Sequence, residues 1–451
     1  MKLPVASKIS SAFPSLTVRN FRLFTVGQAV SAIGTWMMIV AQDWLVLSLS
    51  SDSVTALGTV TALQFAPILL LTLYGGLMAD RYDKRRLLVA ANVAAGGLAL
   101  LLAVLVLAGE VRLWHINLLA LAVGCINAVE TPARMAFVSE MVGPELLPNA
   151  SAITATYSNV AQIVGPAGAG LLISAVGTGP VMVMNAVTFF GTVITLCLMR
   201  PAELHEPPVQ EKPAAGAGVR DGLRYTAGRR DLVPVFGLVA AVSLFGFNFQ
   251  LTLPLFAKTV FHTDAAAFGM FTTAMAVGSL LAALATAGRR VRPSARMVVV
   301  AALGFGAVEA AAGWAPTAVT AVVLLALTGF ATLYFAQATY QHIQLGTDPQ
   351  YRGRVMALYI LIQQGSTPLG ALLIGWLTTH LGSRSGLWAG GLISLFAALV
   401  TLLALRSAPA REEPPGADGS AGARSRLGAG RKGARTSLEE AAAGQRRTES
   451  D

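Results

Sequence analysis

The sequence predicts an all-α polytopic membrane protein with twelve transmembrane helices in two six-helix parallel repeats. The chain of 451 residues is 54% hydrophobic and only 12% charged, far from the average of soluble proteins. It contains twelve apolar runs of roughly the 20 residues that a helix needs to cross a bilayer. Because strand-like alternation is absent and backbone groups inside lipid need internal partners, these runs are expected to be helices rather than barrel strands.

The N-terminal half is expected to cover residues 21–199, after a cytoplasmic segment at 1–20. Its first apolar run has no small-residue cleavage site and is followed by many further spans, so it is a retained helix rather than a signal peptide. The predicted spans of this half are 21–48, 56–79, 87–107, 113–133, 153–176 and 180–199.

The C-terminal half is expected at residues 233–406, after a proline-rich cytoplasmic linker at 200–232. Its predicted spans are 233–257, 266–287, 297–314, 316–340, 355–380 and 386–405. The tail at 407–451 has Leu427 and Leu438 as its only large apolar residues, so we expect a disordered cytoplasmic tail.

The basic residues predict the orientation of the spans in the cell membrane. With both termini in the cytoplasm, 30 of the 33 Lys and Arg residues fall in cytoplasmic segments, and only Arg112, Lys258 and Arg384 lie outside. Short loops rich in Lys and Arg are retained in the cytoplasm. The net charge of +10 is therefore a topology signal, and no basic folded domain for nucleic acid is expected.

The two halves repeat one motif at a constant offset of 202 residues. In the fifth and eleventh spans, the tyrosine, glutamine, proline and glycine of this motif are Tyr157, Gln162, Pro166 and Gly168, and Tyr359, Gln364, Pro368 and Gly370. Each proline removes a backbone donor, and each glycine permits close approach, so these helices are expected to bend or slide against the other half.

A short charged loop joins the second and third spans. It reads GGLMADRYDKRRL over residues 75–87 and contains Gly76, Asp80, Arg81 and Arg85. This order resembles the signature loop of the major facilitator superfamily. Further similar stretches are RNFR at 19–22, ETPAR at 130–134 and RGRVMALY at 352–359.

Over residues 18–406 the chain is thus similar to a twelve-helix exporter of this superfamily. The similarity is to the drug and siderophore subgroup, which contains macrolide efflux pumps and the enterobactin exporter. In these transporters the six-helix halves are parallel repeats.

The resemblance implies that the charged loop is a cytoplasmic gate of the outward-open state, in which Gly76 lets the second helix approach the eleventh. Asp80 would then face the N-terminal end of that helix, and Arg81 or Arg85 would reach Glu130. The alternative is that these cations only fix the topology.

Polar residues inside the spans are candidates for a substrate cavity, because they would be costly against lipid. Four of them share one face of the first span: Gln28, Ser31, Thr35 and Gln42. The resemblance places spans 1, 4, 7 and 10 around the cavity, which adds Asn127, Asn248, Tyr334, Gln337 and Gln341. Hydrogen bonding between helices remains an equal alternative for each residue. Aromatic residues of span 7, such as Phe247 and Phe249, could stack on a ligand or simply pack.

Three carboxylates lie inside the predicted spans, where acids are functional candidates. Asp43 adjoins the polar face of the first span and is a candidate for proton coupling or for attracting a cationic substrate, with a solvated interfacial acid as the alternative. Glu309 is expected to snorkel or to lie at an interface. Glu130 is one turn before Arg134, which predicts an ion pair.

The motifs of enzymes and of ATP-driven pumps are absent from the sequence. No Lys follows a Gly, so there is no phosphate-binding GxxxxGK[ST] loop. The stretch HEPPV at 205–209 is no zinc motif, and neither a metal nor a cofactor is expected. The sequence therefore predicts a secondary transporter that exports small amphiphilic compounds by alternating access in exchange for protons. A siderophore exporter, an uptake symporter and a non-transporting membrane sensor are the alternatives.

Overall fold

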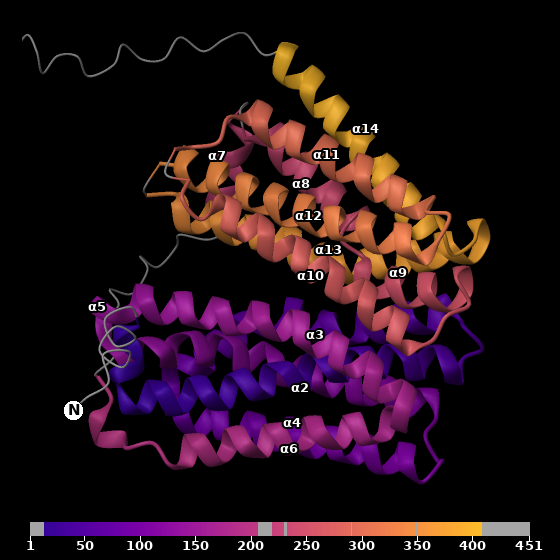
Figure 1. The fold of residues 1–451 in the computed structure, drawn as a ribbon. Coiled ribbons are helices and arrows are strands. Elements are labelled where there is room, and N and C mark those ends of the chain that lie inside the picture. The colour runs from indigo at the N-terminus through magenta and orange to yellow at the C-terminus, as the bar shows by residue number, and fades with distance from the viewer. Residues whose placement is uncertain (1–12, 206–218, 230–231, 290, 349, 408–451) are drawn as a thin grey trace, which may run out of the picture. The chain divides into compact units, whose positions relative to one another are not determined.

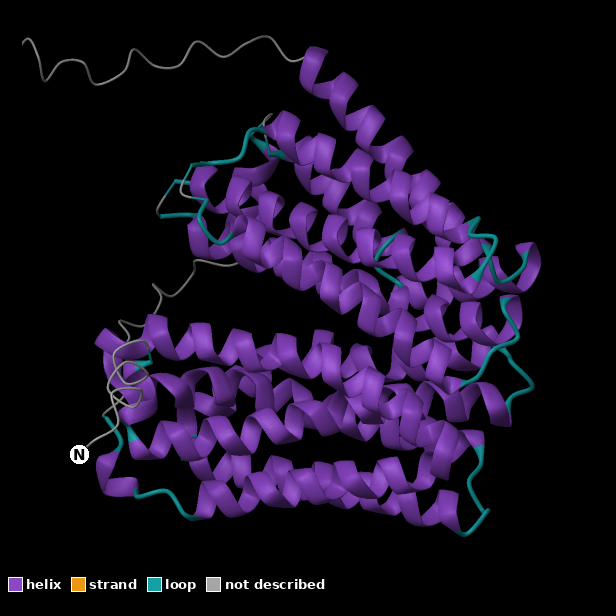
Figure 2. Cartoon of the chain, viewed as in Figure 1, coloured by secondary structure: helices purple, strands orange, loops and turns teal. Residues whose placement is uncertain are grey.

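Every regular element in the described part of the chain is a helix (Figures 1 and 2). The computed structural model describes residues 13–205, 219–229, 232–289, 291–348 and 350–407. Eleven candidate spans are found there, one of them, at 64 residues, long enough to cross a bilayer twice. The predicted all-α membrane fold is therefore confirmed. Most of the N-terminal segment, much of the linker and nearly all of the tail lie outside the described residues.

Most of the long helices begin and end within a few residues of the predicted spans, and α5, α12 and the divided seventh span are the main differences. In the first part of the chain they are α2 (Arg19–Leu49), α3 (Val54–Arg81), α4 (Lys84–Leu107), α5 (Leu113–Val176) and α6 (Thr178–Cys197), preceded by the short η1 (Pro14–Thr17). After η2 (Pro201–Glu203) and α7 (Val219–Ala227) come α8 (Val233–Phe245), α9 (Phe249–Leu255), η3 (Phe256–Val260), α10 (Ala265–Thr286), α11 (Ala295–Gly313), α12 (Ala318–Gly346), α13 (Arg352–Leu381) and α14 (Ser385–Ser407).

Side-chain caps define the start of five of these helices. In each, an oxygen of the residue before the helix accepts a hydrogen bond from a free backbone N–H of the first turn. The capping residues are Ser53, Asp83, Asp264, Ser294 and Thr317.

Helix α5 joins the two spans predicted at 113–133 and 153–176. Its helical hydrogen bonding continues past Gly143, the one residue with non-helical angles (φ 71°, ψ 173°). Only glycine adopts a positive φ without strain, so the chain turns sharply there while remaining helical on both sides.

The span predicted at 233–257 is not one continuous helix. It divides into α8, α9 and the π-helical turn η3, with a break at residues 246–248. The side-chain amide of Asn248 donates to the Leu244 carbonyl (2.8 Å) and replaces a backbone donor that the break removes. Pro254 inside α9 removes a further donor.

Two groups of helices are evident in Figure 1, an N-terminal group of α2–α6 and a C-terminal group of α8–α14. Both groups share one hydrophobic cluster, which includes Val46 and Leu57 of the first group and Phe256 and Phe271 of the second. This cluster lies at the end of the helices that carries Lys258, called here the Lys258 end.

Toward the opposite end, which carries Lys84 and is called the Lys84 end, each group has a cluster of its own. Phe21 and Phe137 belong to the N-terminal cluster, and Val298 and Val355 belong to the C-terminal cluster. The two groups are therefore packed together at the Lys258 end and have separate cores at the Lys84 end.

Candidate functional site

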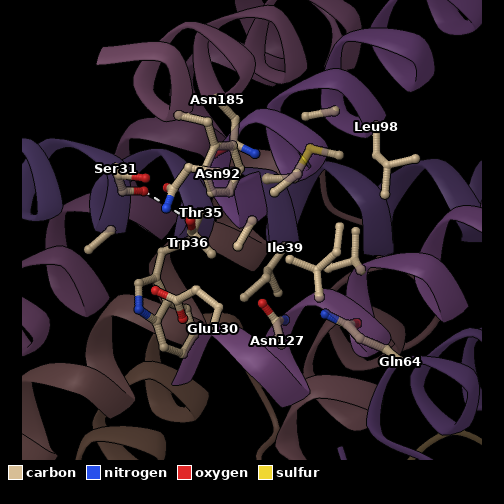
Figure 3. Close-up of a pocket in the computed structure, with 18 of the residues that line it drawn as sticks. Ser31, Thr35, Trp36, Ile39, Gln64, Asn92, Leu98, Asn127, Glu130 and Asn185 are labelled. Atoms are coloured by element: carbon tan, nitrogen blue, oxygen red, sulfur yellow. Dashed lines mark hydrogen bonds between the residues drawn. The ribbon is translucent and has the colours of Figure 1, made fainter. Parts of the chain in front are cut away.

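A cavity of about 380 Å³ lies among α2–α6 and is completed by Gln250 of α9 (Figure 3). All four polar residues predicted on the first span line it: Gln28, Ser31, Thr35 and Gln42. The Thr35 hydroxyl donates to the Ser31 carbonyl (2.9 Å), which leaves its lone pairs free to accept a hydrogen bond. We call this space the first cavity.

Side-chain amides dominate the rest of the polar lining. Asn127 was predicted, whereas Gln64, Asn92, Asn185 and Gln250 were missed although each interrupts an apolar run. Asn92 donates to the Leu88 carbonyl (2.8 Å), while the buried Oδ1 of Asn185 has no hydrogen-bond partner among the described residues. Amides both donate and accept hydrogen bonds, so this wall suits a ligand with many oxygen or nitrogen atoms.

The charged residues that line the first cavity are Glu130 and Arg134 of α5. The Arg134 Nε and the Glu130 Oε1 lie 3.0 Å apart, one turn apart on the helix, so the structure shows the expected ion pair. Because the two charges compensate each other, the described lining is polar without a net charge.

A second cavity of about 230 Å³ lies between the two groups and shares Trp36, Ile39 and Gln250 with the first. Phe249 and Phe268 give it aromatic walls. Its one ionisable side chain is Asp43, which is 3% exposed and whose Oδ2 has no hydrogen-bond partner among the described residues. The structure thus places Asp43 in a largely apolar space beside the polar cavity rather than in an interfacial, solvated position.

The residues predicted to line the cavity from the C-terminal group do not line either cavity. Tyr334 accepts a hydrogen bond from Arg289 (2.8 Å) and lies under its guanidinium. Asn248 supports the break between α8 and α9, and Gln337 and Gln341 are absent from both linings. The expectation for these positions came from the family resemblance alone, and the Asn248 amide is used instead at the break in the seventh span.

The aromatic residues of the seventh span divide between the two alternatives. Phe247 packs edge-on against Phe305 (5.4 Å between ring centroids) and Phe335 (6.3 Å). Phe249 lines the second cavity and also packs edge-on against Phe305 (6.3 Å between ring centroids).

Close approach between the groups involves different glycines from those predicted. A Cβ at Gly168 would meet no atom within 4 Å, whereas at Gly170 it would lie 2.8 Å from the Ala265 carbonyl oxygen of α10. The Pro166 carbonyl lies against Gly269. In α5, the contact glycine is therefore Gly170, one half-turn after the expected position.

The duplicated motif has unequal surroundings in the two helices. Gln162 lines the second cavity, but Gln364 is exposed. Gly370 packs against Leu244 and Asn248 at the break in the seventh span. Tyr157 and Tyr359 are both buried, and the Tyr359 hydroxyl donates to the Ala336 carbonyl (3.4 Å).

The gate contacts expected of an outward-open state are not made in this structure, in which the two groups have separate cores at the Lys84 end, so the gate stays a prediction. Arg85 donates to the Leu196 and Cys197 carbonyls (2.7 and 2.9 Å), at the end of α6, instead of reaching Glu130. Asp80 and Arg81 are exposed. The physical reason is that a helix end offers free carbonyls, which bind a cation well.

Two neighbours of the predicted gate residues make close contacts within the N-terminal group. A Cβ at Gly76 would meet no atom within 4 Å, whereas a Cβ at Gly75 would clash with the Ala128 carbonyl. Lys84 pairs with Glu140 at 2.6 Å, and both side chains are only 12% exposed. No spacing pattern in the sequence predicts this pair, because the two residues are far apart in the chain.

At the Lys258 end an ion pair joins the two groups. The Lys258 Nζ lies 2.6 Å from the Asp52 Oδ1, donates to the Ser48 hydroxyl (3.3 Å) and lies 5.3 Å from the centre of the Trp44 ring. Lys258 sits in the π-helical turn η3. We call these four residues the Lys258 socket.

The backbone around the socket is unusual. Among the described residues, the non-glycine residues with a positive φ are Ser51 (51°), Asp52 (64°) and His262 (51°). All three lie at this junction, on both sides of the ion pair. Backbone strain of this kind persists only where surrounding contacts hold it in place, and it often marks switching segments.

Glu309 is not the snorkelling or interfacial acid that was expected. It is 1% exposed, because glycines of α14 allow that helix to pack closely on α11: a Cβ at Gly391 would lie 2.4 Å from the Ala310 nitrogen.

Comparisons with known proteins agree with one another over most of the chain. A family described as transmembrane secretion effector matches residues 10–417. The enterobactin exporter EntS of Escherichia coli is 26% identical over 401 residues, which is 88% of this chain and 94% of that protein. The staphyloferrin A transporter of Staphylococcus aureus is 24% identical over 344 residues, or 76% and 85% of the two chains.

Solved structures share the fold. A bacterial homologue of the human lysosomal transporter Spinster, in an inward-facing conformation, superposes with a TM-score of 0.68 at 15% identity and covers 87% of this chain and 98% of its own. The nucleoside transporter NupG gives a TM-score of 0.70 at 10% identity, covering 86% and 100%. At such identities the similarity concerns the fold alone.

Proposed function

The chain belongs to the transmembrane secretion effector family of the major facilitator superfamily, and from this premise we propose that it exports small amphiphilic compounds in exchange for protons. It is a multi-pass secondary transporter and not an enzyme. The proposal concerns its substrate class, its direction of transport and its coupling ion.

The observation that carries the substrate class is the pair of adjoining cavities. The first offers amides and hydroxyls without net charge, and the second offers Trp36, Phe249 and Phe268 around Asp43. A ligand that spans both would need a polar part with many hydrogen-bonding atoms and an apolar part. Pockets of this mixed kind are typical small-molecule sites.

The unequal packing of the two ends supports alternating access. If the basic loops lie in the cytoplasm, the Lys84 end is cytoplasmic, both termini are cytoplasmic, and the structure is an inward-open state. The Lys258 socket and the shared hydrophobic cluster would then close the outer side. Substrate would enter the first cavity from the cytoplasm, and release would require the Lys258 end to separate.

Asp43 is the candidate for proton coupling. Burying an isolated carboxylate is costly unless it is paired or neutralised, and the Asp43 Oδ2 has no partner among the described residues. Protonation from the outer side and release to the inner side would give each transport cycle a direction. The neighbouring Trp36 ring would also stabilise a cationic group beside the carboxylate.

Export of a siderophore is the second candidate. Two relatives carry siderophore names, the enterobactin exporter and the staphyloferrin A transporter, and the amide-rich first cavity suits a ligand rich in oxygen atoms. A strongly anionic ligand would, however, be repelled by an ionised Asp43, so this candidate requires Asp43 to be protonated when substrate binds.

The proposal is tested with a panel of amphiphilic compounds and siderophores in a host that lacks its own exporters. Cells that express the protein should retain less of at least one compound, and a protonophore should abolish the difference. Asp43→Asn is the matched variant, since it keeps the shape of the side chain and removes its charge. Uptake instead of efflux would favour a symporter, and binding without flux would favour a sensor.

A further inference from the structure

Glu309 of α11 is a buried acid that neither cavity uses. We propose that Glu309, together with the hydroxyls of Ser243 and Ser394, forms a second proton-binding site behind the break in the seventh span. Occupancy of this site would be linked to the conformation of the break. The inference rests on the alternating access proposed above and adds a second acid to it.

The described surroundings of Glu309 offer its carboxyl group neither a hydrogen-bond donor to Oε2 nor a neighbouring positive charge. Its Oε2 is buried and has no hydrogen-bond partner among the described residues. Arg384, which precedes α14, has other partners: its guanidinium donates to the Gly313 and Ala315 carbonyls (3.0 and 2.9 Å) and lies over the rings of Phe256 and Phe261.

The helices packed around Glu309 bring no other ionisable side chain near it in the described part of the chain. Helices α8 and α9 carry none. The other ionisable side chains of α11 and α12 lie toward the Lys84 end, and α14 carries none up to Leu405: those of α11 and α12 are Arg296, Tyr334, Tyr340 and His342. A proton is therefore the simplest way to neutralise the carboxylate.

A backbone acceptor lies beside the carboxyl. A Cβ at Gly390 of α14 would lie 2.6 Å from the Phe245 carbonyl oxygen and 3.1 Å from the Glu309 Oε1, so these two oxygens flank the same glycine. Phe245 is the last residue of α8, and among the described residues no backbone N–H donates to its carbonyl across the break. A protonated Glu309 can supply the donor that the broken helix lacks.

Two buried hydroxyls complete the proposed site. Ser243 is 2% exposed and Ser394 is 0% exposed, and neither Oγ has a partner among the described residues. Ser243 lies one turn before Gly246, which packs on Phe305 of α11. Ser394 lies one turn after Gly390. Both hydroxyls are thus on helix faces turned toward α11.

The site is connected to the second cavity through α9. This helix begins directly after the break and supplies Phe249, Gln250 and Leu253 to the cavity wall. A neutral Glu309 would brace the end of α8 by its hydrogen bond. An ionised Glu309 could no longer donate this hydrogen bond and would leave an unpaired buried charge. Proton release would therefore favour another conformation of residues 246–248 and a displacement of α9.

The test uses purified protein in lipid nanodiscs without substrate, so that it is independent of any transport assay. The native Cys125 and Cys197 are replaced by serine, and Asp43 is replaced by asparagine in every protein compared, so that the other acid proposed to bind protons does not contribute to the pH response. Ser158→Cys reports access to the first cavity, and Ala266→Cys reports opening of the Lys258 end, where Gly170 contacts α10. The ratio of the two labelling rates is measured against pH, with and without Na⁺.

The ratio should change with pH by about fivefold, the effect of one net hydrogen bond. Glu309→Gln, which keeps a neutral donor, should hold the ratio at its low-pH value. Glu110→Gln, an exposed acid of the same charge, should titrate like the parent. Ser394→Ala should shift the midpoint of the titration.

A Glu309→Gln profile equal to that of the parent would overturn the proposal. A ratio that depends on Na⁺ at fixed pH would replace the proton by a metal cation. If Glu309→Gln fails to insert, an unchanged midpoint in Ser394→Ala would count against the site. Absence of export with an intact pH response would instead count against the proposed function alone.

Discussion

Replacing Asp52 by asparagine should weaken the closure of the Lys258 end. The side chains of Lys258 and Asp52 are 21% and 39% exposed and their charged atoms are 2.6 Å apart, so the pair is only partly screened by solvent. Exposed ion pairs contribute about 0.2–1 kcal/mol. Asparagine tolerates the positive φ of position 52 as well as aspartate does, so Asp52→Asn changes the charge without adding backbone strain.

Lys258→Met should have a larger effect than Asp52→Asn. It removes the ion pair and also the contact of the ammonium with the Trp44 ring, 5.3 Å away, which contributes about 0.5–1 kcal/mol at such sites. The sum, about 1–2 kcal/mol, corresponds to a shift of roughly 5- to 30-fold in the ratio of the two states. Asp52→Asn alone should shift it only about two- to fivefold.

The assay is the labelling of Ala266→Cys from the outer side, in the background without native cysteines. Both variants should be labelled faster than the parent, and the double variant should be no faster than Lys258→Met, because the two residues share one interaction. Glu110→Gln is the control for loss of an acid at the same end. Equal labelling of all variants, or additive effects in the double variant, would refute the closing role of the Lys258 socket.

Three further predictions concern the cavities and the close contacts. Gly170→Leu should abolish transport while leaving insertion intact, because its side chain would displace the backbone of α10, whereas Gly168→Leu, with open space around it, should be tolerated; flux and membrane yield are compared. Asp43→Asn should reduce gradient-driven efflux at least tenfold and preserve ligand binding. If the pH dependence of flux is the same in the variant and the parent, Asp43 does not couple transport to protons. Lys84→Ala should lower the melting temperature of the protein by a few degrees, because it leaves the largely buried Glu140 carboxylate without its ion-pair partner. An unchanged melting temperature would show that the pair does not stabilise the fold.

Much of the fold could be predicted because membrane spans leave simple signals. Length, hydropathy and charge bias place helices such as α2 and α6 within two residues of their observed ends. The break between α8 and α9 could not be predicted, since residues 246–248 are apolar or amidic and the break depends on Phe305 and Asn248 packing in three dimensions.

The residues of the candidate site could be predicted only where polar side chains recur at helical spacing along one span. The stripe on α2 follows from helical spacing, and all four of its residues line the first cavity. Gln64, Asn92 and Asn185 lie singly on three different helices, so no spacing connects them. The Asp52–Lys258 pair joins residues about 200 positions apart in the sequence, and its role depends on which end of the helices is closed.

We propose that a proton gradient drives export through the cavity that contains Asp43. The most direct measurement is the accumulation of a compound identified by the efflux panel in inside-out vesicles that contain the purified protein. With an acidic lumen, the vesicles should take up the compound, and this uptake should stop when the gradient is dissipated and be lost in Asp43→Asn. Uptake of equal rate and extent without a pH gradient, or in Asp43→Asn, would contradict it.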